Sequence, residues 1–137
     1  MPPTLRPKDA ATLVLIKRSG AVPEVLLGQR HGGHAFMPNR YVFPGGRVDP
    51  SDSRVVPSTS LTQDVAARLE KNCSPARARA LAVAAVRETY EETGLMLADQ
   101  MPAGVLTSRD RSWSDFAKQG VGPALGHLKY ICRAITP

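Results

Sequence analysis

Short apolar runs rich in branched residues open the chain, and longer segments with apolar residues at helical spacing follow them. The runs at 11–17 and 24–30 predict two strands, and 18–23 between them predicts a hairpin connection. The run at 41–43 predicts a shorter strand, which Pro44-Gly45-Gly46 ends. Adjacent glycines let bare backbone approach a ligand closely, although a tight turn alone also accounts for them.

The longest periodic segment predicts a helix whose two ends are visible in the sequence. Ser74 is a favourable N-cap, Pro75 suits the first helical position, and Gly94 suits the residue after the last turn. Residues 76–93 between them are rich in Ala, Leu, Arg and Glu, which favour helix. One stripe of this helix is apolar and is expected to face a core: Val83, Val86 and Tyr90.

A different stripe of the same helix carries three acids near its C-terminus: Glu88, Glu91 and Glu92. Like charges at this spacing repel by roughly 0.2–0.5 kcal/mol per pair, and the helix dipole disfavours anions there. Only Arg87 provides a nearby positive charge that would reduce this repulsion. A sequence that breaks local rules often does so at a functional site, and a divalent cation such as Mg²⁺ would compensate the charge. The alternative is a solvated acidic face with no ligand.

Together, the glycine pair and the acidic helix resemble the signature of the Nudix hydrolase family, G-x5-E-x7-R-E-U-x-E-E-x-G-U, where U is bulky and apolar. Gly46 matches the opening glycine, and 87–95 matches the closing half. The match has three departures. Asp52 replaces the first glutamate, Thr89 replaces a bulky apolar residue, and 34 residues separate Asp52 from Arg87 where the signature has seven.

We interpret the excess length as a helical insertion at about 53–73. Residues 55–60 are loop-like, and 61–71 predicts a short helix with Leu61, Val65 and Leu69 on one face. Such an insertion costs little, because loop-closure entropy grows slowly with length. The peroxisomal coenzyme A diphosphatases and similar bacterial proteins interrupt the signature at this place. They also carry stretches similar to Phe36-Met37-Pro38 and 42–49.

The resemblance, which covers roughly residues 11–95, implies an α/β fold built as an α-β-α sandwich around a mixed sheet. The chain length fits one domain, 1–137. The implied activity is hydrolysis of the pyrophosphate bond in a nucleoside diphosphate derivative, with coenzyme A or acyl-coenzyme A as the expected substrate. ADP-ribose or NADH pyrophosphatase activity is an alternative, as is a Nudix-like module that senses a nucleotide without cleaving it.

The resemblance also implies a metal site, in which a cofactor, Mg²⁺ or Mn²⁺, is held by the Gly46 backbone carbonyl and by three acids: Glu88, Glu91 and Glu92. One of these glutamates would take a proton from the attacking water, and Arg87 would orient the acids. Gly45 and Gly46 would let the substrate approach the backbone. Arg30, at a strand end before a glycine-rich loop, and Arg40 are the candidate phosphate-binding groups.

The C-terminal part predicts fewer elements than the resemblance requires. Residues 112–116 indicate the capped start of a short helix that ends near Gly120, and 128–135 predicts a strand. The related fold continues with a further strand and a second helix, but only 96–137 follow the motif. We therefore expect either a longer natural protein or a partner subunit, such as a second copy of the chain, that covers the sheet.

The net charge of +6, from eighteen basic and twelve acidic residues, suits a phosphate-rich small molecule. Nucleic-acid binding is a third hypothesis, but the basic residues are scattered and lack interleaved aromatics, which favours a solvated surface. Cys73 and Cys132 form no recognisable disulfide or metal pattern. The apolar run at 11–16 is too short for a signal peptide or a membrane span, so we expect a cytoplasmic location.

Overall fold

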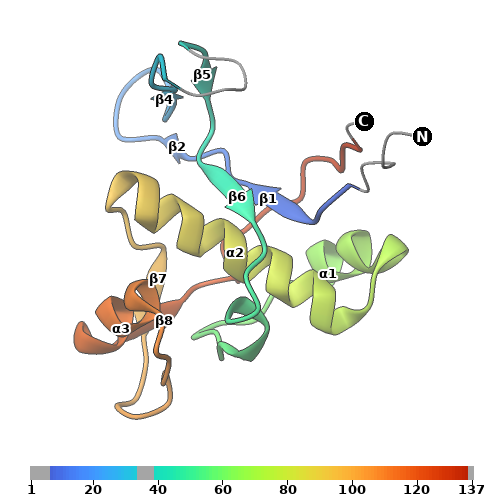
Figure 1. Ribbon diagram of the computed structural model, residues 1–137, viewed down its shortest axis with the longest axis vertical. Helices are drawn as coiled ribbons and strands as arrows, with labels where there is room; N and C mark the ends of the chain where they lie inside the picture. The colour runs from blue at the N-terminus through green and yellow to red at the C-terminus, as the bar shows by residue number, and fades with distance from the viewer. Residues whose placement is uncertain (1–6, 34–38, 136–137) are drawn as a thin grey trace.

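One long helix, α2 (Pro75–Thr93), runs through the middle of the molecule, with the N-terminal strands on one side and a shorter helix with the C-terminal strands on the other (Figure 1). The computed structural model describes residues 7–33 and 39–135. The predicted ends of α2 are confirmed. Ser74 Oγ accepts a hydrogen bond from the Arg77 amide at 3.2 Å, and Gly94 adopts the left-handed conformation with φ of 74°.

The N-terminal strands are shorter than predicted. The expected strand at 11–17 is divided into β1 (Ala10–Thr12) and β2 (Ile16–Lys17), and the expected strand at 24–30 into β3 (Glu24–Val25) and β4 (Gly28–Gln29). The predicted hairpin is present, because β2 pairs antiparallel with β3. β4 pairs with β5 (Tyr41–Val42). These two pairs, which we call the arm, extend away from α2 (Figure 1).

The glycine pair does not form a turn. Gly45 and Gly46 lie in strand β6 (Gly45–Arg47), which pairs antiparallel with β1 and lies against α2 (Figure 1). A Cβ on Gly45 would lie 2.5 Å from the Ala11 carbonyl oxygen, so this strand pairing requires glycine. The predicted strand at 41–43 does end before Pro44, since β5 ends at Val42. The interpretation of the glycines as a tight turn was wrong, because local propensity does not show the partner strand β1.

The second half of the chain packs on the other side of α2. β7 (Ala98–Gln100) pairs antiparallel with β8 (Val121–Pro123), and α3 (Arg111–Lys118) lies between them in sequence. The predicted helix is thus present, although Asp110 caps it. The predicted strand at 128–135 is wrong: no described strand pairs with it, and Ile131 and Ile135 are 70% and 72% exposed. Apolar alternation without a partner did not produce a strand.

The segment between the two halves of the motif contributes to the core. It forms η1 (Asp52–Arg54), α1 (Gln63–Leu69) and η2 (Glu70–Asn72), and Val55 and Val65 are buried. The 55–60 stretch is not only a loop, because Thr59 forms a parallel bridge with Ala124 beside β8. Backbone hydrogen bonds reinforce this contact, including that of the Leu125 amide to the Thr59 carbonyl at 3.1 Å. The segment therefore joins α2 to the C-terminal half.

The α/β class is confirmed, with smaller sheets than expected. The described strands form four two-stranded antiparallel sheets in place of one mixed sheet. The main core lies between α2 and α3, and its buried members are Val55, Ala82, Val83, Val86, Leu106, Trp113, Phe116 and Leu125. The arm and the loops that join its strands expose large apolar side chains, namely those of Ile16, Val22, Val25, Leu27, Tyr41 and Phe43. Among the described helices, none is long and apolar enough to cross a membrane.

Candidate active site

A buried ion pair connects the two halves of the motif. Arg87 Nε donates to Asp52 Oδ1 at 2.8 Å and Arg87 Nη2 donates to Asp52 Oδ2 at 3.1 Å, which is a two-point contact. Asp52 is 0% exposed and Arg87 is 5% exposed. Burial alone would lower the pKa of Arg87, but hydrogen bonds to Asp52 and Glu91 raise it above its usual value. Arg87 is therefore a permanent cation inside the protein.

The same guanidinium also binds two acids of the helix. Arg87 Nη1 donates to Glu88 Oε1 at 3.0 Å and to Glu91 Oε2 at 3.1 Å, and Arg87 Nη2 donates to the Arg47 carbonyl at 2.9 Å. Arg87 thus offsets part of the repulsion between the acids and ties α2 to β6. The role of Arg87 in orienting the acids stays a prediction.

Glu88 and Glu92 both face the glycine pair of β6. The Glu88 carboxylate fills the place where a Gly46 side chain would begin, since a Cβ there would lie 2.4 Å from Glu88 Cδ. Glu92 Oε2 accepts a hydrogen bond from the Gly45 amide at 3.3 Å. Two carboxylates from the last turns of α2 therefore converge on backbone that carries no side chains.

The third predicted acid, Glu91, lies against α3. Its Oε1 accepts a hydrogen bond from Ser112 Oγ at 2.7 Å, while its Oε2 is bound by Arg87. The three acids therefore do not form one ready cluster. Within residues 7–33 and 39–135, no three Asp, Glu, His or Cys side chains are grouped closely enough to hold a metal ion.

The Glu88–Glu92 pair nevertheless has the donor chemistry that a hard divalent cation requires. Burial raises the pKa of Glu92, and the neighbouring charges of Glu88 and Glu91 raise it further. The Gly45 amide and the positive charge of Arg30 lower it in part. Negative charge is thus concentrated beside β6 and incompletely balanced by the protein, which a cation between the two carboxylates would relieve.

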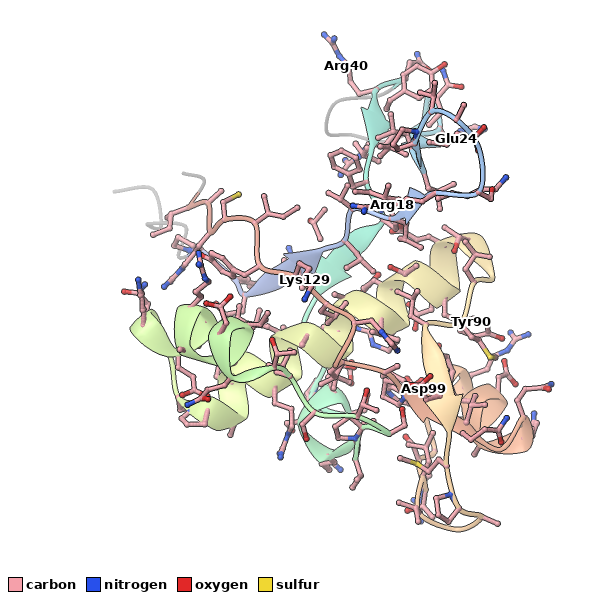
Figure 2. All side chains as sticks on the ribbon, turned by 180° about the vertical axis from the view of Figure 1, so that it is seen from behind. Arg18, Glu24, Arg40, Tyr90, Asp99 and Lys129 are labelled. Carbon is pink, nitrogen blue, oxygen red and sulfur yellow. The ribbon has the colours of Figure 1, made fainter. Side chains whose placement is uncertain are left out.

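The two candidate phosphate-binding arginines are placed differently. The positive charge of Arg30 contributes to lowering the pKa of Glu92, so Arg30 acts electrostatically on the acids. Arg40 lies at the far end of the arm and points away from α2 (Figure 2). Their backbones are hydrogen-bonded, with the Arg30 amide donating to the Arg40 carbonyl at 2.9 Å. The Phe36-Met37-Pro38 stretch lies outside the described residues.

A solved structure of a Nudix hydrolase from Alicyclobacillus acidocaldarius is similar to this chain, with a TM-score of 0.67 and 31% sequence identity over 98% of the chain. The chain has the Nudix hydrolase fold. It spans 64% of the length of the Alicyclobacillus protein. No family model matches the chain, and neither does any curated protein.

Within the Nudix fold, the structure shows what the residues that depart from the signature contact. Asp52 stands where the signature has glutamate and keeps a carboxylate bound to Arg87, even though 53–86 intervene. Thr89 is fully buried, and its Oγ1 donates to the Ala85 carbonyl at 2.8 Å. An intrahelical hydrogen bond therefore satisfies the hydroxyl where the signature has an apolar side chain.

Sequence reasoning missed one residue that touches the acids, Ser112. Its position near the start of a capped helix was visible, but its contact with Glu91 depends on how α3 packs on α2. A cavity of about 570 Å³ lies nearby, beside η1. Its lining carries two arginines and one acid, and comprises Ser51, Arg54, Val55, Thr107, Ser108, Arg109 and Asp110.

Proposed function

We propose that this chain is a metal-dependent Nudix-type hydrolase that cleaves the pyrophosphate bond of a nucleoside diphosphate derivative. The convergence of Glu88 and Glu92 on Gly45 and Gly46 is the observation that carries this proposal. The similarity to a Nudix hydrolase across nearly the whole chain supports it. The buried Arg87 beneath the acids supports it further, because a solvated acidic face has no need of such an anchor.

The residues that would hold Mg²⁺ or Mn²⁺ are Glu88, Glu92 and the backbone carbonyl of Gly46, with Glu91 as the fourth member of the expected set. A bound divalent ion would neutralise the diphosphate and lower the pKa of an attacking water. One of the glutamates would accept the proton of that water. Arg87 would keep the carboxylates oriented through its hydrogen bonds to Glu88 and Glu91.

Arg30 is the better candidate for binding a substrate phosphate. Its charge acts on Glu92, so a phosphate held there would also be near the acids, whereas Arg40 points away from them. We propose coenzyme A or acyl-coenzyme A as the substrate, because the interrupted signature resembles that branch of the family. The net charge of +6 suits such a polyanion.

Product chromatography with coenzyme A, dephospho-coenzyme A, ADP-ribose and NADH, with and without Mg²⁺ or Mn²⁺, tests this function. We expect metal-dependent cleavage at the pyrophosphate and at least a hundredfold lower turnover for Glu92→Gln. Glu70→Gln, an exposed acid on η2, is the matched control and should keep wild-type turnover. Equal turnover by Glu92→Gln and wild type would refute the metal site.

The substrate panel also tests the branch assignment. We expect coenzyme A to be cleaved more efficiently than dephospho-coenzyme A, which lacks the ribose phosphate. A tenfold or greater preference for ADP-ribose, equivalent to about 1.4 kcal/mol of transition-state stabilisation, would replace the coenzyme A assignment and keep the Nudix one. Nucleotide binding without cleavage of any compound would favour the sensing module.

A further inference from the structure

α3 packs against the C-terminal half of α2 through aromatic contacts and a hydrogen bond. Trp113 and Phe116 are fully buried and pack edge to face, with ring centroids 5.1 Å apart. Tyr90 points from α2 toward α3 (Figure 2), and its hydroxyl donates to Asp115 Oδ2 at 2.9 Å. Ser112 is itself only 6% exposed. Its hydroxyl is therefore presented to α2 from a fixed position.

The Ser112 hydroxyl contacts Glu91, an acid whose negative charge is unfavourable at its position in α2. Glu91 lies near the C-terminus of α2, where the helix dipole opposes negative charge. The first turn of α3 faces it instead, and the N-terminal end of a helix favours anions. The Ser112–Glu91 distance of 2.7 Å is that of a charge-assisted hydrogen bond. α3 thus supplies part of the compensation that α2 lacks.

The two contacts of Glu91 also fix the direction of its carboxylate. Ser112 binds Oε1 and Arg87 binds Oε2, so each oxygen has one protein partner. A carboxylate oxygen has two lone pairs, so each oxygen keeps one for a cation or a cation-bound water. Without Ser112, rotation about the last side-chain bond of Glu91 would be restrained from one side only.

We propose that Ser112 is a positioning residue of the acid site, which acts through Glu91 and makes cation binding depend on the docking of α3. This inference rests on the proposed function, because it assumes a divalent cation at the acids. It assigns Ser112 no contact with substrate. Its effect on cation affinity should therefore disappear when the Glu91 carboxylate is removed.

Ser114 provides a matched control on the same helix. Its hydroxyl is partly buried and donates to the Ser108 carbonyl at 3.1 Å, away from the acids. Ser112→Ala and Ser114→Ala each remove one hydroxyl and one hydrogen bond from the first turns of α3. A purely structural role of Ser112 would make the two variants alike, both in melting temperature and in cation affinity.

Isothermal titration with Mn²⁺ alone, together with melting temperatures in metal-free buffer, tests the proposal. We expect the Mn²⁺ dissociation constant to rise at least fivefold in Ser112→Ala and to stay within twofold in Ser114→Ala. Ser112→Thr keeps the hydroxyl and should restore the affinity. In the Glu91→Ala background, Ser112→Ala should change the affinity less than twofold.

Equal Mn²⁺ affinity in Ser112→Ala and wild type would overturn the proposal and leave the proposed function intact. Additive effects of Ser112→Ala and Glu91→Ala would also overturn it. Absence of Mn²⁺ binding by wild type would refute the metal site and the role of Ser112 together. If Ser112→Ala does not fold, Ser112→Cys, which replaces the hydroxyl with a weak donor, takes its place under the same criteria.

Discussion

Replacement of Asp52 by Asn should destabilise the fold strongly, although it removes no atom from the core. Asp52 is fully buried, and Asn would leave the Arg87 guanidinium buried without the carboxylate that binds it at two points. Breaking a buried ion pair from one side costs about 3–5 kcal/mol. Arg87 keeps Glu88, Glu91 and the Arg47 carbonyl as partners, so we expect the lower end, about 3 kcal/mol.

That loss is a large part of a total stability of about 5–15 kcal/mol. It corresponds to a decrease in melting temperature of about 10 °C for a chain of this size. Urea denaturation in metal-free buffer measures the free energy of unfolding directly. Asp49→Asn is the matched control, because Asp49 is an exposed acid three residues away, and it should cost less than about 1 kcal/mol. A loss below about 1 kcal/mol for Asp52→Asn would refute our view of the ion pair.

Gly46→Ala should lower Mn²⁺ affinity at least tenfold in isothermal titration, because the new Cβ would displace the Glu88 carboxylate from β6. Gly45→Ala should instead lower the melting temperature, since its Cβ would meet β1 backbone at 2.5 Å; the reverse pattern would contradict both assignments. Arg30→Ala should raise the KM for the cleaved nucleotide at least fivefold, and Arg40→Ala should leave it within twofold. Equal effects of the two arginine variants on KM in steady-state kinetics would refute the assignment of Arg30 as a substrate-binding residue.

The elements set by local interactions were predictable from the sequence. Ser74, Pro75 and Gly94 lie within a few residues of the groups they cap, so the bounds of α2 follow from nearest-neighbour chemistry. The hairpin between β2 and β3 is equally local. The proximity of Gly46 to Glu88 was predictable only through the Nudix signature, since 41 residues lie between them in the sequence.

The elements that depend on distant partners were not predictable in the same way. Gly45 and Gly46 form a strand because β1 lies beside them, and neither residue favours a strand by itself. β7 and β8 are short, and the chain between them contains α3. They can pair only when that intervening segment brings the two strands together. Residues 128–135 have strand-like composition but no described partner strand. Strand pairing is a long-range property, and apolar patterns record it incompletely.

In the candidate site too, local features were predictable from the sequence and contacts with distant residues were not. Helical spacing predicted one stripe of α2 for Glu88, Glu91 and Glu92. It did not show that Glu88 and Glu92 face β6 while Glu91 faces α3, because both partners come from other parts of the chain. Asp52 could be aligned with the signature, but its full burial against Arg87 depends on how η1 packs on α2.

Anomalous diffraction from a crystal equilibrated with Mn²⁺ would test the proposed metal site most directly. We expect one strong peak between the carboxylates of Glu88 and Glu92, within coordination distance of the Gly46 carbonyl oxygen. The same peak should be absent from a Glu92→Gln crystal. A wild-type crystal with no peak at these carboxylates, from protein that still cleaves a pyrophosphate substrate with Mn²⁺, would contradict the assignment of this site.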